Sequence, residues 1–225
     1  MSKIFFVSDT HFGHQKEFLY SPRGFITSEQ HDKSIIERWN SIINEDDIVY
    51  HLGDVMLGDN DHGIECIKQL KGHIKIIRGN HDTDKRIELY KTLENVEYLG
   101  WADVIKYKKY HFYLSHHPTL TANYDNEKPP KARLINLFGH THQKTKFYDG
   151  NIFMYHVGLD SNDCYPVLLD DIIEEINNEF YMKEENECTQ SGIWTIIVQQ
   201  VKKLFSRISG VLPMIRKKQA DTTEI

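Results

Sequence analysis

LINLFGHTH, residues 134–142, joins a short apolar run to two histidines that are separated by one threonine. The run is typical of a buried strand, and Gly139 marks its end. In an extended chain, residues two apart point to the same side, so His140 and His142 are expected to face one place together. The stretch therefore predicts a strand that brings a pair of imidazoles to the edge of a sheet.

Further apolar runs of the same kind predict buried strands at residues 4–7, 48–52, 74–77, 112–114 and 152–157. Helical patterns are expected at 28–43, from about Asp61 to Gly72, after Asp82, and from near Asp170. Thr27 and Gln30 fit a capping box at the start of the first helix. Strands that alternate with helices, followed by closely spaced strands, predict an α/β fold with a mixed sheet system.

The predicted strands end in side chains that bind metals or transfer protons. In chain order the ends read SDTH, GD, RGNHD, SHHP and GHTH. The residues of these types are Asp9, His11, Asp54, Asn80, His81, Asp82, His116, His117, His140 and His142. Because ligands of open α/β sheets bind beyond the carboxyl ends of the strands, one shared site is expected.

The residue types set the kind of ion. Aspartate, asparagine and histidine without cysteine suit divalent ions such as Mn, which we expect first, and Fe, Ni, Co or Zn. Two carboxylates, one amide and four imidazoles exceed the about three protein ligands of one catalytic ion. Two ions that share a bridging carboxylate are therefore expected. Residues two apart on a strand are about 6.5–7 Å apart and paired metals about 3.5–4 Å apart, which favours His140 and His142 on neighbouring ions.

In this order, DTH, GD, GNHD, a histidine in SHHP and GHTH resemble the signature of the calcineurin-like metallophosphoesterase superfamily. The resemblance covers residues 4 to about 160. More narrowly, DTHFGH, ERWN, DDIVYHLGD and HVGLD are similar to the small bacterial and phage phosphoesterases of that superfamily. The resemblance implies a four-layer α/β/β/α sandwich of mixed sheets with a dinuclear site.

The resemblance also implies roles for the residues of the site. The first metal would be held by Asp9, His11 and His142, and the second by Asn80, His116 and His140, with Asp54 bridging. His81 matches the family's proton donor. His117 competes with His116, which we prefer because the family's ligand directly follows the small residue.

A dinuclear metal-dependent phosphoester hydrolase is expected, either a phosphodiesterase or a small-nucleotide phosphatase. Two cations would neutralise the ester oxygens and hold water as the hydroxide nucleophile, while His81 acts as general acid. The segment after Asp54 lacks the GDxVDRG form of protein phosphatases, which disfavours phosphoprotein substrates. A non-catalytic metal-containing binding scaffold on the same fold and a nuclease subunit are the alternatives.

Several residues keep two interpretations. His14 would either bind substrate phosphate or lie in a polar loop, and Arg23 would either clamp phosphate oxygens or serve a structural role. Asp82 would either orient the His81 imidazole or cap the next helix. His51, inside an apolar run, is expected to support a ligand or to be a core histidine.

Composition restricts the partners and the location. The chain of 225 residues has a net charge of −6, which argues against tight sequence-independent binding to nucleic acid. Cys66, Cys164 and Cys188 show no metal-type spacing and are expected to be reduced cysteines of a cytoplasmic protein. The chain shows neither a signal-peptide pattern nor the about 18 unbroken apolar residues of a membrane span.

The chain is expected to divide into two parts. Residues 1–182 would form the phosphoesterase domain, and residues 183–225 would add a polar linker and a basic amphipathic helical extension. Residues 193–218 carry six basic and no acidic side chains. This segment is expected to dock on the protein's own core, to bind a partner, or to lie on an anionic membrane surface. The oligomeric state stays open.

Overall fold

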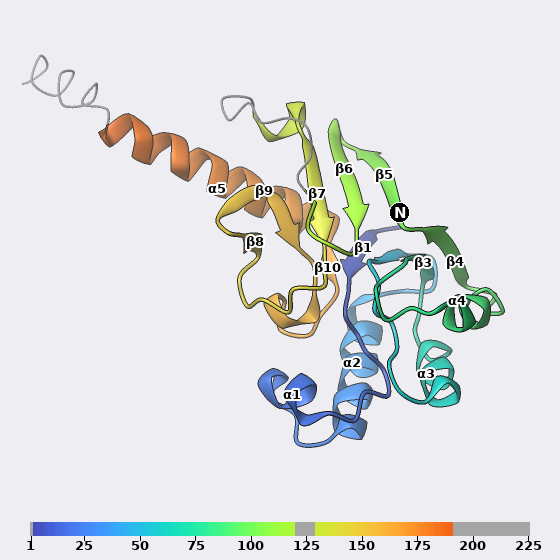
Figure 1. Cartoon of the computed structure of the whole chain (residues 1–225). Coiled ribbons are helices and arrows are strands. Elements are labelled where there is room, and N and C mark those ends of the chain that lie inside the picture. Colours follow the sequence, from blue (N-terminus) through green and yellow to red (C-terminus); the bar gives the residue numbers. More distant parts are fainter. Residues whose placement is uncertain (1, 120–128, 191–225) are drawn as a thin grey trace, which may run out of the picture. The chain divides into compact units, whose positions relative to one another are not determined.

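Two mixed five-stranded sheets form the centre of the computed structural model, which describes residues 2–119 and 129–190 (Figure 1). The first sheet has the order β10 (Val167–Leu168), β1 (Ile4–Val7), β2 (Ile48–His51), β3 (His73–Ile77) and β4 (Val96–Gly100). The second has the order β5 (Ala102–Tyr107), β6 (Tyr110–Ser115), β7 (Leu134–Phe138), β9 (Asn151–His156) and β8 (Phe147–Tyr148). Strands β1 to β4 are parallel, as are β6, β7 and β9, while β10, β5 and β8 pair antiparallel.

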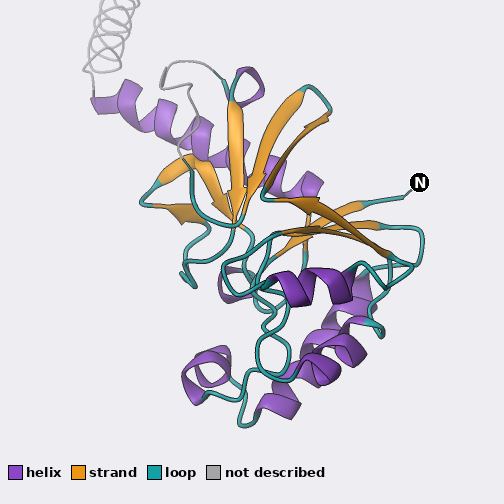
Figure 2. Cartoon of the chain, turned by 45° about the vertical axis from the view of Figure 1, so that its right-hand side comes forward, coloured by secondary structure: helices purple, strands orange, loops and turns teal. Residues whose placement is uncertain are grey.

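Alternation along the strands of the first sheet produces two apolar cores. Phe5 and Val7 of β1 pack with helices on one face, whereas Phe6 packs with the second sheet on the other. The helices on the first face are α2 (Ser28–Ile42), α3 (Asn60–Ile67) and α4 (Asp84–Tyr90) (Figure 2). Helix α5 (Leu169–Gln190) adds Ile172 and Ile176 to the core of the second sheet. The predicted α/β sandwich of helices and two mixed sheets is confirmed.

Helix starts follow side-chain capping, with shifts from the predicted positions. The Thr27 side chain accepts from the N–H of Gln30, as predicted, but the Gln30 side chain accepts from the N–H of Ile26. Helix α3 is capped by Asp59, two residues before the expected Asp61. The short elements are α1 (Glu17–Tyr20) and the 3-10 turns η1 (Ser21–Arg23), η2 (Pro130–Ala132) and η3 (Leu159–Ser161).

The chain divides into two units, residues 1–177 and residues 178–225. The first unit contains both sheets and every candidate site residue. In the second unit, the polar stretch from residue 183 is helical through Gln190, and the basic segment 193–218 lies outside the described residues. The domain boundary at residue 182 stays a prediction. Among the described residues, no helix is long and apolar enough to cross a bilayer.

Candidate metal centre

The seven predicted ligands come together where strands of both sheets end. Asp9 and His11 follow β1, Asp54 follows β2, and Asn80 follows β3. From the second sheet, His116 follows β6, while His140 and His142 follow β7. Four of the seven ligands are buried, whereas Asn80, His140 and His142 are partly or fully exposed. The buried ones are Asp9, His11, Asp54 and His116, each no more than 3% exposed.

Asp9, His11 and His142 form a first donor group. The Nε2 atoms of His11 and His142 are 3.2 Å apart, and Asp9 Oδ1 lies 3.8 Å and 4.0 Å from them. Asp9 Oδ2 accepts from the Ser8 hydroxyl and from the N–H of His140. In contrast, Asp9 Oδ1 is buried without a hydrogen-bond partner among the described residues. A buried carboxylate oxygen that faces two imidazoles fits a bound cation.

Asn80, His116 and His140 form a second donor group. Asn80 Oδ1 lies 2.8 Å from His116 Nε2 and 2.8 Å from His140 Nδ1. His116 Nδ1 lies 2.8 Å from the Leu52 carbonyl, which can only accept, so this nitrogen carries a proton. In a neutral His116 ring, Nε2 is therefore unprotonated, and its lone pair points at Asn80 Oδ1. A cation, either a proton or a metal ion, relieves that contact, so the donors fit a metal.

Asp54 lies between the two groups. Its Oδ2 is 3.4 Å from His116 Nε2 and 3.8 Å from His11 Nε2. Its Oδ1 accepts from the backbone N–H of His81 at 2.8 Å, which fixes the carboxylate's orientation. One oxygen held toward both groups is the arrangement that a bridging ligand requires.

The electrostatics of the site favour positive charge. Burial opposes the charged form of Asp54, but the His116 and His11 imidazoles lower the pKa of its carboxyl below the usual range. Burial is likewise outweighed at His116, where Asp54 and Asp9 raise the pKa to about 9. His11 behaves differently because its burial dominates and lowers its pKa. A proton held at His116 therefore marks a place where the protein stabilises a cation.

The backbone at the site is strained. L-residues rarely adopt positive φ angles, and each instance costs of order 1–3 kcal/mol. Five of the seven predicted ligands do so, with φ between 48° and 68°: Asp9, His11, Asp54, His140 and His142. Such strain clusters where function requires a particular side-chain direction. The strand ends therefore turn sharply to aim ligands into one place.

Glycine permits the close approach of the strand ends. A Cβ atom on Gly53 would lie 2.5 Å from the backbone nitrogen of Gly79 and 2.7 Å from His116 Nδ1. These separations are shorter than a real Cβ atom tolerates, so the GD and GN motifs need their glycines for packing.

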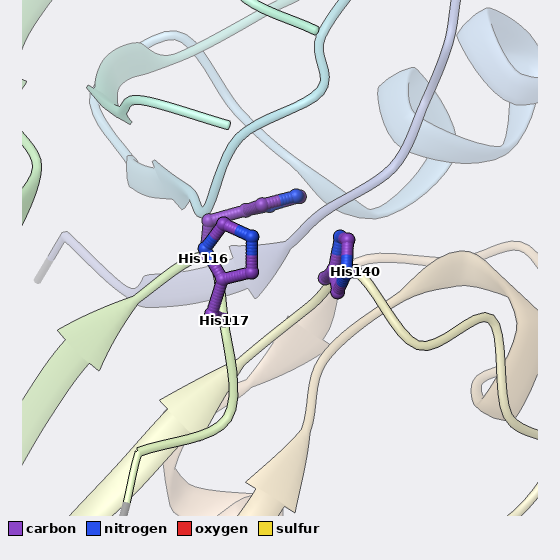
Figure 3. Close-up of side chains that lie close together, drawn as sticks. All are labelled: His116, His117 and His140. Carbon is purple, nitrogen blue, oxygen red and sulfur yellow. The ribbon is translucent and has the colours of Figure 1, made fainter. Parts of the chain in front are cut away.

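His117 lies beside the second donor group, as Figure 3 shows. Its ring centroid is 4.3 Å from that of His140 and 5.0 Å from that of His116. His116 is buried and contacts Asn80, whereas His117 is exposed. This geometry favours the sequence-based choice of His116, and His117 is placed to contact a ligand from the solvent side.

The substrate-side residues occupy different environments. His81 Nε2 lies 4.0 Å from Asp54 Oδ2, and 44% of the side chain is exposed. His14 is partly exposed, and its ring centroid is 5.9 Å from that of His11. Arg23 is buried, and its guanidinium donates to Asp160, His31 and the Asp9 carbonyl. The arrangement around Arg23 favours the structural interpretation.

Asp160 supports the site, although it was not among the site residues predicted from the sequence. Its Oδ2 accepts from His142 Nδ1 at 2.8 Å and pairs with Arg23 at 2.8 Å. Burial opposes its ionisation, but His142 and Arg23 lower the pKa of its carboxyl. The HVGLD motif contains Asp160, and that motif was the available signal.

Asp82 takes neither of its two expected roles. Its carboxylate is buried and accepts from the N–H groups of Gly79 and Asp54 and from the Tyr90 hydroxyl. Thr83, not Asp82, caps α4. Asp82 instead ties the GD and GNHD segments to each other.

His51 is a buried core histidine. Its Nε2 lies 2.9 Å from the Thr10 hydroxyl, which itself donates to the Val55 carbonyl. Burial lowers the pKa of His51 to about 3. Through Thr10, His51 supports the segment that carries Asp9 and His11, so both expectations for it hold in part.

The fold and the donors define an α/β protein whose strand ends are built to hold divalent metal. Comparisons with known proteins agree: a family model for the calcineurin-like phosphoesterase superfamily domain matches residues 2–159. The chain is 38% identical over 129 residues to an uncharacterised protein of Methanocaldococcus jannaschii, covering 56% of this chain and 65% of that protein. It is 27% identical over 202 residues to the Gene 66 protein of Mycobacterium phage D29, and this match covers 79% of this chain and 98% of the phage protein.

A solved structure of a protein of unknown function from Aquifex aeolicus has the same fold, with a TM-score of 0.59 at 22% identity. That match covers 77% of this chain and 99% of the other. The chain belongs to the calcineurin-like phosphoesterase superfamily, a class of metal-dependent phosphoesterases. The family expected from the strand-end motifs is confirmed.

Proposed function

We propose that this chain is a phosphoester hydrolase that holds two divalent ions, manganese first among them, and acts on phosphodiesters or small nucleotides. The observation that carries the proposal is the position of Asp54 Oδ2 between two complete donor groups. Each group combines imidazoles with one oxygen donor, and neither contains a thiolate. Such sets suit Mn, Fe, Co, Ni or Zn.

The ions, when bound, would act as Lewis acids on the phosphoryl oxygens and on the attacking water. The residues of the chain keep the donors rigid before substrate arrives. Asp9 is held by Ser8 and by the N–H of His140, and Asp54 by the N–H of His81. Preorganised charge of this kind costs little reorganisation during the reaction.

His81 is the proposed proton donor. Its backbone N–H is bound to Asp54, while its half-exposed ring lies at the solvent side of the site. A positioned imidazole that protonates a leaving alkoxide contributes about 10²–10⁴-fold to the rate. The position of His81 next to Asn80, but outside both donor groups, supports this role.

His14 is the proposed phosphate contact, because it is partly exposed and stacks edge-on near His11. Arg23 is proposed to act on substrate only indirectly. Its guanidinium orients Asp160 and the Asp9 carbonyl, and both lie behind the first donor group.

Turnover of bis-p-nitrophenyl phosphate and p-nitrophenyl phosphate tests the proposal. We expect hydrolysis with Mn²⁺, faster for the diester, and none with chelator. His81→Ala should lower kcat by about 10²-fold or more with both ions still bound. His111→Ala, which removes an exposed histidine of β6, should change neither quantity. Manganese binding without turnover on either ester would support a scaffold instead, and metal loss in His81→Ala would contradict the role of His81.

A further inference from the structure

A separate cluster of metal-ligating side chains lies between two helices. Asp32 belongs to α2, while His62 and Cys66 belong to α3, and one ligand atom of each lies within 4.8 Å of the others. His62 and Cys66 are four residues apart, so their side chains lie on the same face of the helix. Both helices cover the same face of the first sheet (Figure 1).

We propose that Asp32, His62 and Cys66 form an auxiliary site for zinc or a similar borderline divalent cation, distinct from the candidate metal centre. His62 Nε2 is 2.8 Å from Asp32 Oδ2 and 3.5 Å from Cys66 Sγ. Tetrahedral zinc with bonds of about 2.0–2.3 Å holds its ligand atoms about 3.3–3.7 Å apart. The first pair would separate by about half an ångström to admit the ion, and the second already fits.

The Asp32 carboxylate is already oriented for this role. Arg23 donates to His31 Nε2, so His31 Nδ1 carries the proton that is donated to Asp32 Oδ1 at 2.9 Å. The N–H of Gly13 fixes Oδ2 at 2.9 Å, and Asp32 is only 3% exposed. Hydrogen bonds of this kind orient metal-binding carboxylates. One oxygen of Asp32 is thereby directed at His62.

The site is open on the side of His62. The side chain of His62 is 48% exposed, so an ion and a water as fourth ligand can enter from solvent. Three protein ligands plus solvent is a common zinc arrangement. An ion here would link α2 to α3 next to Gly13, which follows the ligand His11 by two residues.

Cys66 distinguishes this site chemically from the candidate metal centre. Burial, with the charges of Asp32 and Glu65, raises the pKa of the Cys66 thiol to about 12, so the metal-free sulfur is protonated. A bound cation displaces that proton, and binding is accompanied by proton release. The resulting thiolate ligand has no counterpart in the two donor groups, which offer only oxygen and nitrogen.

Cobalt substitution tests the site because cobalt(II) bound to thiolate gives a charge-transfer band in the near ultraviolet. The full-length, chelator-stripped protein is titrated with Co²⁺. We expect the saturated band to correspond to one thiolate-bound cobalt per chain, in addition to the cobalt taken up by the candidate metal centre. The band should disappear in Cys66→Ser and should require at least tenfold more cobalt in His62→Ala. Cys164→Ser and Cys188→Ser, which remove the other thiols, should keep it. Zn²⁺ should displace the cobalt and abolish the band.

The Asp54→Ala variant separates this inference from the proposed function. It damages the candidate metal centre but should keep the cobalt–thiolate band, since Asp54 is not among the three ligands. Absence of the band at saturating cobalt would overturn the inference. A band that persists in Cys66→Ser, or that needs no more cobalt in His62→Ala, would also overturn it. The His62 side chain is half exposed, so His62→Ala should still fold. This variant therefore tests the site even where Cys66→Ser does not fold.

Discussion

The two donor groups of the candidate metal centre are held by different chemistry. Behind the first, His142 Nδ1 donates to Asp160, which is paired with buried Arg23 at 2.8 Å. Behind the second, His116 Nδ1 donates to the uncharged carbonyl of Leu52. One group is supported by a buried ion pair, and the other by a neutral backbone acceptor.

In the proposed two-ion site, this difference would make the two ions bind unequally. The first group contains the carboxylate of Asp9 and a histidine made more basic by Asp160, whereas Asn80 gives the second group only a neutral oxygen. Since Asp54 is shared, the remaining charge favours the first group. We therefore expect the first ion to bind more tightly and the second to exchange more readily.

The largest effect is expected from Asp54→Ala, which removes what the two groups share. Its loss leaves His116 and His11 without their common oxygen, so both ions should weaken and turnover should fall by more than the about 100-fold that outer-shell changes cost. Elemental analysis and kcat on a diester check this. Near-normal turnover with two bound ions would show that the groups work independently.

Asp160→Asn should act on one group only. Losing the charge behind His142 should weaken the first ion by about 10–100-fold and leave the second unchanged. Competition between metal and a chelating dye, followed over both binding steps, measures the two affinities. Asp163→Asn is the matched control, since that aspartate is exposed. Equal weakening of both ions would remove the proposed asymmetry.

The smallest effect on the two donor groups is expected from His51, which supports the first group through Thr10. Burial lowers its folded pKa to about 3, below the unfolded value of about 6.5, so the unfolded state binds more protons between those values. Stability should therefore fall as pH drops from about 6.5 toward 3, by up to about 1.4 kcal/mol per pH unit. Below about pH 3 both states bind this proton, so the stability that neutral His51 contributed is fully lost and the slope from this residue ends.

In His51→Gln, the slope of the unfolding free energy against pH should be smaller by the equivalent of about one proton. Urea unfolding of metal-free protein across that range measures the slope, with His73→Gln as the control because His73 is exposed. Equal slopes in wild type and His51→Gln would show that His51 is not held neutral in the core.

The sequence predicted the interior strands of both sheets and missed their edges. The predicted runs correspond to β1, β2, β3, β6, β7 and β9, while the missed strands are β10, β4, β5 and β8. The missed four lie at the ends of the two sheet orders. Strands β8 and β10 have two residues each, and β4 and β5 are largely half-exposed. Edge strands bury fewer side chains, so they lack the apolar run that identifies a strand.

The candidate site likewise contains residues that the sequence predicted and residues that it missed. The ligands could be predicted because their residue types stand directly after apolar runs, as Asp54 and Asn80 do. The supports could not, because they come from tertiary contacts. Asp82 accepts from the N–H of Asp54, 28 residues away, and Asp160 reaches His142 across 18 residues. Spacing along the chain carries no sign of such partners.

Anomalous diffraction from crystals of manganese-loaded protein tests the central claim most directly. Two peaks are expected, one at Asp9, His11 and His142 and one at Asn80, His116 and His140, with the Asp54 carboxylate touching both. The peak at the first group should have the higher occupancy at limiting metal. A single peak, or density away from Asp54, would contradict the two-ion account.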